Sequence, residues 1–519
     1  MKRIFSLFML LTAMAVLLFS AATAEEKTFL PDDLPVIYLH IDGGEAEIGK
    51  MNTSPDHSYR CTGTVDIVVP DGYTGEFEGR FPQESVYGLK LDFIRGRGNG
   101  TWGSSKLPYK IKLSEKTDLF GMGKNKHWVL LANYYDNSLL RNWLTEWIGS
   151  EMGLNYTPMG VFVDLVMNGE YLGSYYFCEQ VRVAKARVGI DELTVNDRDL
   201  PAIQGGYLLE FSPDEWESPN TFETAHGQLF GLSSPSFDPK DGGYENDAQK
   251  TYIQDYVQRV EDAIFSPDGV NAHGERYYDL LDLQSAADYW WVQEFSLNGD
   301  AFRTDSAHLY KERFEKDGSA GKLYYGPLWD FDESWGNAFL KTTLSAGFNN
   351  AQSIWLDELR TKPEFQVLLK ERWHVFDRKL EEIVRTGGVL DQTYMLIRNS
   401  WYRDYERWQK ARAEDETGIS RNLEEEIEHI RGWVNLRREW INKNLDRIGI
   451  LSFTLTVKGE KIEDREYTIT CDSLLDPSDI ELPEVEGLTF AGWTFEDGTP
   501  ADDPFLMDRD ITLIAVFEE

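Results

Sequence analysis

The fold is decided by a stretch at residues 95–113, RGRGNGTWGSSKLPYKIKL. Its glycines Gly98, Gly100 and Gly103 have the spacing G-x-G-x-x-G, which lets backbone N–H groups approach phosphate oxygens because no Cβ atom stands in the way. Apolar residues alternate with lysines from Tyr109 to Leu113, which predicts a strand after this loop. A Rossmann nucleotide site needs a helix at that place, so the pattern argues against a Rossmann domain.

Three lysines follow the glycines, namely Lys106, Lys110 and Lys112. Strand alternation predicts that Lys110 and Lys112 lie on the same face of their strand. A glycine loop between two strands, with lysines on the second strand, is how protein kinases cover the phosphates of ATP. An ordinary β-turn with solvated lysines is the alternative interpretation, because the glycine motif by itself has low specificity.

Outward from this stretch, the N-terminal half combines strands with a helix. Runs rich in β-branched and aromatic residues predict strands at 34–41, 61–69, 89–95, 109–113, 161–167 and 171–177. The dipeptide Asn168-Gly169 between the last two runs predicts a tight hairpin. Apolar residues at helical spacing predict a helix at 137–152. This half is therefore expected to be mixed α+β.

The chain from about Tyr252 to Arg447 has mostly helical periodicity, with two strands and a loop predicted at 310–335. The clearest helix is the last one, which we expect to close the core with an apolar face formed by Ile427, Ile430, Val434, Ile441 and Leu445. Several tryptophans could form a carbohydrate platform, but on amphipathic segments they more often belong to the core: Trp128, Trp143, Trp147, Trp290, Trp291 and Trp329.

After Ile450 the pattern changes to short strands at 453–457, 466–470, 488–493 and 511–517. Two stretches, GLTFAGW at 487–493 and DRDITLIAVF at 508–517, resemble the Listeria–Bacteroides surface repeat, a small β-rich module. One copy is visible, so we expect residues 450–519 to form a spacer or attachment domain and not a solenoid.

A group of aspartates lies far from the lysines in the sequence. Asp300 and Asp305 belong to one segment, and Asp330 and Asp332 belong to a later one, WDFD at 329–332. Mg²⁺ takes one or two carboxylates together with waters and substrate phosphates. On an extended segment Asp330 and Asp332 would point the same way and could share a metal ion. A turn cap, a solvated pair or a Ca²⁺ site is the alternative, although the oxygen spacing of an EF-hand is absent.

Asp300 precedes Asp305 by five residues, which is the offset between the catalytic base and the second metal ligand in a kinase catalytic loop. In such a loop the base accepts the proton of the attacking hydroxyl group. Asp305 stands where that loop has an asparagine, which leaves its role as a metal ligand open.

The N-terminus predicts export. Lys2 and Arg3 precede an apolar run and a small-residue cleavage site, so residues 1–24 are expected to be a signal peptide and residues 25–33 a polar segment. Removal of this peptide changes the net charge from −37 to −39, which disfavours nucleic acids and anionic membranes and favours cationic partners. No C-x-x-C pair occurs, so a zinc or redox site is not expected, and at most one disulfide can form among Cys61, Cys178 and Cys471.

A series of short segments occurs in a fixed order along the chain. They are RGNGTW at 97–102, KLPYKIKL at 106–113, WVLLANYYD at 128–136, LRN at 140–142, VMNGEYLGSY at 166–175, EQV at 179–181, GYLLE at 206–210 and WDFD at 329–332. In this order they resemble the CotH kinase family. The resemblance covers roughly Leu34 to Arg447, which gives a kinase-like domain at residues 34–449.

The resemblance implies an atypical protein-kinase-like fold of the α+β class that binds ATP with Mg²⁺ or Mn²⁺. In spore-forming relatives such proteins phosphorylate Ser-rich spore coat proteins. Transferred to this sequence, the family pattern implies that the nucleotide phosphates are contacted by Gly98, Gly100, Lys106 and Lys112, with Lys110 as an alternative.

The same resemblance implies roles for the acidic residues. Asp300 would be the catalytic base, and the metal ligands would be Asp330, Asp332 and Asp305. Glu179 would lie near the adenine on a hinge-like strand, and Glu146 is a candidate partner of the phosphate lysine.

The leading hypothesis is therefore a secreted ATP-dependent kinase that phosphorylates Ser or Thr in a basic, Ser-rich extracytoplasmic protein. The main alternative is a non-catalytic surface adhesin, or a polysaccharide-associated module, on a CotH scaffold. The export signal and the repeat-like C-terminus favour this alternative, because ATP is scarce outside cells. A glycoside hydrolase with a carboxylate pair such as Asp300 and Asp330 is a third and weaker hypothesis.

Overall fold

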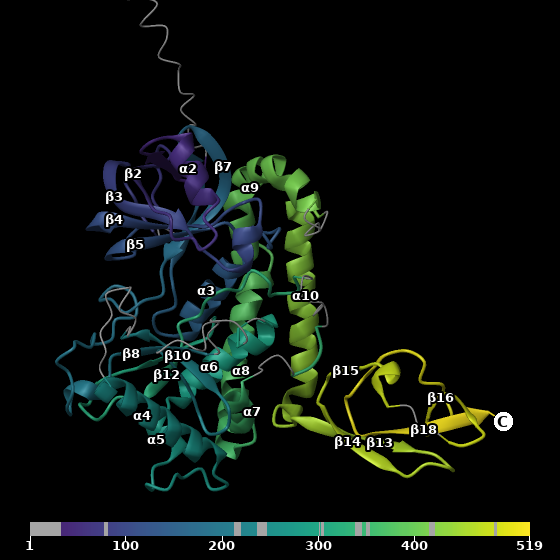
Figure 1. The fold of residues 1–519 in the computed structure, drawn as a ribbon. Coiled ribbons are helices and arrows are strands. Elements are labelled where there is room, and N and C mark those ends of the chain that lie inside the picture. Colours follow the sequence, from purple (N-terminus) through teal and green to yellow (C-terminus); the bar gives the residue numbers. More distant parts are fainter. Residues whose placement is uncertain are drawn as a thin grey trace, which may run out of the picture. The chain divides into compact units, whose positions relative to one another are not determined.

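A computed structural model of the chain describes residues 33–76, 81–211, 220–235, 247–299, 301–302, 306–337, 345–348, 353–414, 421–481 and 485–518 (Figure 1). The predicted signal peptide lies outside these residues. The chain divides into two compact units. Unit 1 comprises Met1–Ala132, Val161–Cys178 and Leu396–Glu416, and unit 2 comprises Asn133–Gly160, Glu179–Met395 and Thr417–Glu519. Among the described residues, no helix has the length and apolar character that a membrane crossing requires.

Unit 1 is built on a closed β-barrel with the strand order β1-β2-β3-β4-β5-β7-β6. The barrel closes where β1 pairs in parallel with β6. Its strands are β1 (Val36–Ile41), β2 (Cys61–Val68), β3 (Val86–Gly96), β4 (Tyr109–Asp118), β5 (Lys124–Leu131), β6 (Gly160–Met167) and β7 (Glu170–Glu179). Among its described residues, this unit also includes helix α2 (Glu45–Asn52) and the part of α9 (Val389–Glu414) that follows Met395.

The glycine stretch joins β3 to β4, which pair antiparallel with Arg95 opposite Lys110. A short 3-10 turn, Gly100–Gly103, lies between them, so the predicted strand-loop-strand arrangement is confirmed. Trp102 fixes this turn, because its Nε1 donates to the Ser54 carbonyl oxygen at 3.0 Å. Its ring lies so close to Gly96 that a Cβ atom there would be 1.9 Å from the ring, so only glycine fits.

The hairpin predicted at Asn168-Gly169 is also present. It joins β6 to β7, and both of its central residues have positive φ, 47° at Asn168 and 83° at Gly169, as a type I′ turn requires. The Asn168 side chain also accepts a hydrogen bond from Ile41 N at 2.7 Å, which ties the turn to the end of β1.

Unit 2 contains a five-stranded sheet with the order β12-β11-β8-β10-β9 and most of the helices. The strands are β8 (Tyr207–Phe211), β9 (Thr221–Glu223), β10 (Leu229–Ser234), β11 (His308–Lys311) and β12 (Leu323–Tyr325). The helices are α3 (Arg141–Met152), α4 (Asp247–Phe265), α5 (Tyr277–Leu280), α6 (Leu283–Ser296), α7 (Ile354–Arg360), α8 (Pro363–Val384) and α10 (Leu423–Asn444). The two strands predicted between residues 310 and 335 correspond to β11 and β12.

Aromatic side chains form much of the core of unit 2. Trp290 and Trp291 on α6 are fully buried, and Trp291 packs against Trp373 of α8. The predicted apolar face of α10 is buried from Ile427 to Ile441, whereas Leu445 lies just beyond the helix and is partly exposed. The tryptophans that the sequence assigns to the core include Trp290, Trp291, Trp128 and Trp143, and all four are buried.

Residues after Ile450 form short strands with a separate apolar core around Trp493, Met507 and Leu513. The strands are β13 (Ser452–Lys458), β14 (Arg465–Thr470), β15 (Leu474–Leu475), β16 (Thr489–Phe495), β17 (Phe505–Leu506) and β18 (Ile511–Glu518). The strands expected from the sequence are therefore present. An ion pair also anchors this segment: Asp472 is fully buried, and Arg447, just after α10, donates to its carboxylate at 2.5 Å.

Several details differ from the sequence-based expectation. The sequence did not predict α2 or the strands β5, β8, β9 and β10. The helix expected at 137–152 begins at Arg141, because the Asp136 carboxylate accepts hydrogen bonds from Ser138 N and Arg141 N and holds the intervening residues in a turn. Leu139 within that turn has a φ of 64°, which is not helical.

Candidate functional site

Lys106 is fully buried in unit 1 and has a full set of partners. Its Nζ lies 2.6 Å from Oδ1 of Asp404 on α9, donates to the Ser174 carbonyl oxygen, and lies 4.7 Å from the centre of the Tyr175 ring. Burial lowers the pKa of Lys106 to about 8, although the Asp404 carboxylate acts in the opposite direction. The Asp404 carboxylate therefore partly offsets the loss of water around the Lys106 ammonium group.

Asp404 connects several elements of unit 1. Besides Lys106, its carboxylate accepts hydrogen bonds from Ser174 N at 3.0 Å and from Arg412 at 3.2 Å. Glu146 is the candidate partner of the phosphate lysine from the sequence, but in the structure Lys106 pairs with Asp404. The sequence contains a signal for this partner, because Ile397, Trp401 and Asp404 have helical spacing. The three residues therefore lie on the same buried face of α9. An aspartate at such a position usually has a buried cationic partner.

The other two lysines lie on β4 between buried residues. Lys110 and Lys112 are partly exposed, while Tyr109, Ile111 and Leu113 are buried, so the predicted common face is confirmed. Lys112 Nζ lies 3.2 Å from the Asp92 carboxylate, and its side chain is 31% exposed. Lys112 is thus accessible to an anion, unlike Lys106.

Two of the three loop glycines have open space beside them, since at Gly100 and Gly103 an added Cβ atom would meet no other atom within 4 Å. At Gly98, which has a φ of 92°, an added Cβ atom would lie 2.3 Å from Thr101 Oγ1. The backbone of Gly100 and Gly103 is therefore not covered by other atoms on that side. This geometry is compatible with an approaching phosphate group.

Asp330 and Asp332 lie in unit 2, in the loop after β12. Asp330 is exposed and has a φ of 66°, whereas Asp332 is only 9% exposed. The segment is thus not extended, and the two carboxylates differ in burial. Burial raises the pKa of Asp332 well above its ordinary value, and repulsion from Asp330, Glu333 and Asp136 raises it further.

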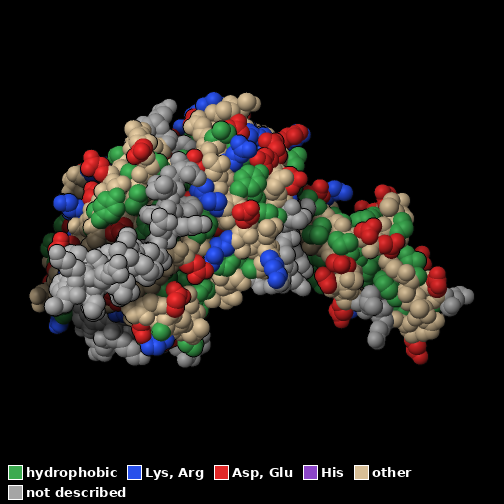
Figure 2. Space-filling view, turned by 90° about the horizontal axis from the view of Figure 1, so that it is seen from above, with side chains coloured by type: hydrophobic (Ala, Val, Ile, Leu, Met, Phe, Trp, Pro, Cys, Tyr) green, Lys and Arg blue, Asp and Glu red, His purple; other side chains and the backbone are tan. Residues whose placement is uncertain are grey.

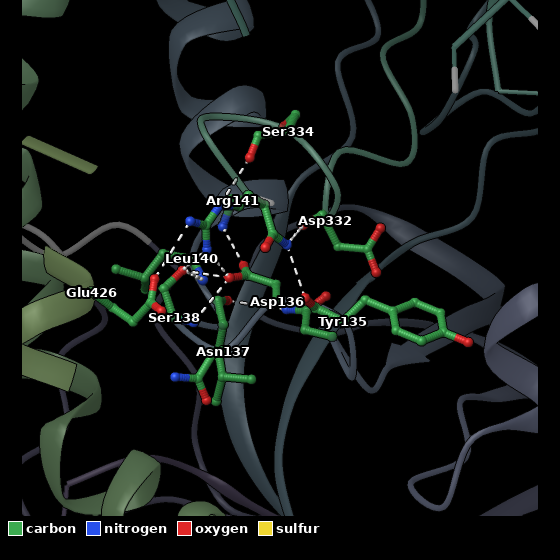
Figure 3. A network of polar contacts seen from close by, with 12 residues as sticks. Tyr135, Asp136, Asn137, Ser138, Leu140, Arg141, Asp332, Ser334 and Glu426 are labelled. Carbon is green, nitrogen blue, oxygen red and sulfur yellow. Dashed lines mark hydrogen bonds and ion pairs between the residues drawn. The ribbon is translucent and has the colours of Figure 1, made fainter. Parts of the chain in front are cut away.

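A buried ion-pair network holds the part of this loop that follows Asp332 (Figure 3). Arg141, at the start of α3, lies between Asp136 and Glu426 of α10, and all three side chains are fully buried. Arg141 Nε also donates to the Ser334 carbonyl oxygen at 2.9 Å. In Figure 3 the Asp332 carboxylate is directed away from the Arg141 guanidinium.

A further amide fixes the same loop. Asn337 Nδ2 donates both to the Asp332 carbonyl oxygen at 2.7 Å and to the Tyr135 carbonyl oxygen at 2.8 Å. The loop is therefore bonded along its length to the segment that precedes α3. The sequence analysis assigned no role to Arg141, although its motif LRN belongs to the family pattern.

Glu179, expected near the adenine, has a buried carboxylate in the structure. It accepts a hydrogen bond from Met159 N at 3.1 Å and pairs with Arg187. Burial raises the pKa of Glu179 to about 7, against the opposing effects of Arg187 and the Met159 N–H group. Its side chain thus already has protein partners, and contacts to a base would come from the backbone of this segment.

The structure brings Lys106 to Asp404 in unit 1 and places Asp330 and Asp332 on one loop of unit 2. Asp300 and Asp305 lie outside the described residues. All three cysteines, Cys61, Cys178 and Cys471, are buried and have free thiols.

A divalent ion fits the chemistry of the aspartate loop. In the part of the chain that the structure describes, no three His, Cys, Asp or Glu side chains are grouped so that they could hold a metal by themselves. Two carboxylates are nevertheless what Mg²⁺ uses when phosphate oxygens and waters complete its shell. Asp330, which is exposed, and Asp332, which is 9% exposed, provide two carboxylates on one loop.

The fold and these residues define an α+β protein with a lysine-bearing glycine hairpin in one unit and an anchored aspartate loop in the other. A comparison with family models identifies the family. The model described as CotH kinase protein matches residues 94–441, about two thirds of the sequence, and the chain belongs to this family. A search of curated proteins found no match.

Proposed function

We propose that the protein is a secreted atypical kinase that binds ATP with Mg²⁺ or Mn²⁺ and transfers the γ-phosphoryl group to a Ser or Thr hydroxyl of another exported protein. Membership of the CotH kinase family supports a kinase-like activity. The observation that carries the proposal is the anchored aspartate loop, in which the little-exposed Asp332 lies two residues from the exposed Asp330 and Asn337 bonds the Asp332 carbonyl oxygen. Two carboxylates on one fixed loop suit a divalent ion whose other ligands are phosphate oxygens and waters.

In this proposal Asp330 and Asp332 hold the divalent ion, which would neutralise charge on the transferred phosphoryl group. The accessible Lys112, which pairs with Asp92, supplies positive charge to the phosphates, and the buried Lys106 anchors the segment before β4 to Asp404. In protein kinases the phosphate lysine likewise pairs with a carboxylate. The glycine loop with Gly98 and Gly100 would lie beside the phosphates, where the open side of Gly100 permits a close approach.

The transfer itself needs a base for the substrate hydroxyl. The hydroxyl oxygen forms a bond to the γ-phosphorus as the bond from that phosphorus to the departing ADP oxygen breaks, and the hydroxyl proton goes to the base. The proposed base is Asp300, with Asp305 as a further metal ligand; neither belongs to the described residues.

The proposed substrate is a basic, Ser-rich extracytoplasmic protein. The sequence has a net charge of −37, and on the face shown in Figure 2 acidic side chains are spread widely, including over the C-terminal β segment. Such a surface attracts cationic partners at low ionic strength.

Nucleotide binding and transfer test the proposal. Millimolar ATP with Mg²⁺ or Mn²⁺ should raise the unfolding temperature of the purified protein, because a ligand that binds only the folded state stabilises it. Labelled ATP should also transfer phosphate to a Ser- and Lys-rich peptide, and chelation of the metal should abolish both effects. If Asp330→Asn transfers label as the wild type does, the proposed metal role is wrong. If the wild type shows neither effect, the non-catalytic adhesin on a CotH scaffold is the better interpretation.

A further inference from the structure

The peptide group between Asp330 and Phe331 is bonded at both ends by side-chain amides. Asn298 Nδ2 donates to the Asp330 carbonyl oxygen at 3.0 Å. The Phe331 N–H group donates to Asn142 Oδ1 at 2.7 Å. Asn142 comes from α3 and is 5% exposed, and Asn298 follows α6 and is 1% exposed. A residue of α3 and a residue just after α6 thus hold one peptide plane from opposite edges.

Asn142 and Asn298 thus form a clamp on the 330–331 peptide group, and Asp330 within it has an unfavourable backbone conformation. Asp330 has a φ of 66°, in the left-handed region, where the Cβ atom of a non-glycine residue crowds the following carbonyl oxygen. Such a conformation persists where the surroundings over-determine it. Fixing the plane of the 330–331 peptide fixes ψ of Asp330 and φ of Phe331. The direction in which the exposed Asp330 carboxylate leaves the loop is therefore set by the two amides.

The Asn142 amide is itself held in place. Its Nδ2 donates to Asn133 Oδ1 at 3.0 Å, and Asn133 Nδ2 donates to the Leu139 carbonyl oxygen at 3.0 Å. This chain of amides defines which atom of Asn142 faces Phe331, because the donor end is already engaged. The clamp is thus pre-organised on a helix start and does not depend on a bound ligand.

We propose that Asn142 and Asn298 are positioning residues, which hold the Asp330 carboxylate in the orientation that binds a divalent cation together with a nucleotide. This inference rests on the proposed function of Asp330. Neither amide contacts the cation; both act through the backbone of Asp330.

The test measures Mn²⁺ binding by isothermal titration calorimetry, with a non-hydrolysable ATP analogue present, for the full chain and the variants Asn142→Ala and Asn298→Ala. Each variant should bind Mn²⁺ about tenfold more weakly, which corresponds to one well-placed hydrogen bond lost. Asn271→Ala is the matched control. Asn271 is also a buried amide of unit 2, at 6% exposure, and it accepts from His273 N and Glu275 N in a turn before α5.

The control separates positioning from stability. Asn271→Ala should lower the unfolding temperature to a similar extent and leave the Mn²⁺ affinity unchanged. Where an alanine variant does not fold, the leucine variant at the same position fills the space of the amide without its hydrogen bonds and carries the same expectation. Folded Asn142 and Asn298 variants that bind Mn²⁺ as the wild type does would overturn the proposal. If the wild type and Asp330→Asn bind Mn²⁺ equally, the proposed function fails instead.

Discussion

The ammonium group of Lys106 lies 2.6 Å from the carboxylate of Asp404, although nearly 300 residues separate them in the sequence and both side chains are fully buried. The pair joins the segment after the glycine loop to helix α9. Neither charge has access to water, so each depends on the other.

Asp404→Ala should therefore destabilise the protein strongly. Loss of one partner of a buried ion pair costs about 3–5 kcal/mol, because the remaining charge is left without compensation. The free energy of unfolding in urea measures the loss. Glu439→Ala is the control, since Glu439 pairs with Lys443 at 2.5 Å but both side chains are more than half exposed. If the two variants lose equal stability, burial of the Lys106 pair has no energetic consequence.

Gly173 lies against the Asp404 carboxylate, so a larger residue there should disturb the Lys106–Asp404 pair. An alanine Cβ at Gly173 would lie 2.3 Å from Asp404 Oδ1, and the residue has a φ of 115°. We expect Gly173→Ala to cost about 2 kcal/mol more than Gly153→Ala, because overpacking adds to the backbone strain. Gly153 also has a positive φ, 84°, but no atom lies within 4 Å of its Cβ position. Equal unfolding temperatures for the two variants would contradict the expected clash.

Much of the fold follows from local sequence patterns. The glycine hairpin, the Asn168-Gly169 turn and the apolar face of α10 depend on residues close together in the chain, and all three are present as predicted. Helix α2 was not predicted, because it buries only Ile48 and Met51 and has little apolar periodicity.

The partners of the candidate site residues could not be predicted in the same way. Asp404, Asn142 and Asn298 act through contacts between segments that are far apart in the sequence, and single polar residues carry no periodic signal. Strand alternation suggested a common direction for Asp330 and Asp332, but the left-handed backbone of Asp330 breaks the alternation. Such a conformation depends on tertiary contacts, which local propensity does not contain.

Glu179 should give the protein a measurable pH dependence. Its pKa is raised from 4.5 to about 7 in the folded state, so the folded protein keeps this proton over a range in which the unfolded chain has lost it. Stability linked to Glu179 is thus greatest at low pH and falls as the pH rises from 4.5 to about 7. The full effect is roughly 3 kcal/mol.

Glu179→Gln removes this titration, since glutamine carries no ionisable proton. The measurement is the difference in the free energy of unfolding between pH 5 and pH 8 for both proteins. We expect the wild type to lose more stability over this range than the variant does. Parallel pH profiles would show that Glu179 ionises normally in the folded protein.

Asp332 links the stability of the protein to its proposed metal. Burial, together with the nearby Asp330, Glu333 and Asp136, raises the pKa of the Asp332 carboxyl group well above its ordinary value, which costs folding free energy near neutral pH, so Asp332→Asn should raise the unfolding temperature of the metal-free protein. The amide keeps nearly the same shape and lacks the charge, and a gain of about 1 kcal/mol is expected. With Mg²⁺ and ATP the order should reverse, because the wild type gains binding energy that the variant cannot gain. Thermal unfolding with and without Mg²⁺ and ATP measures both effects, with Asp199→Asn, an exposed loop aspartate, as the neutral control. If Asp332→Asn keeps the full stabilisation by Mg²⁺ and ATP, the Asp332 carboxylate does not bind the cation.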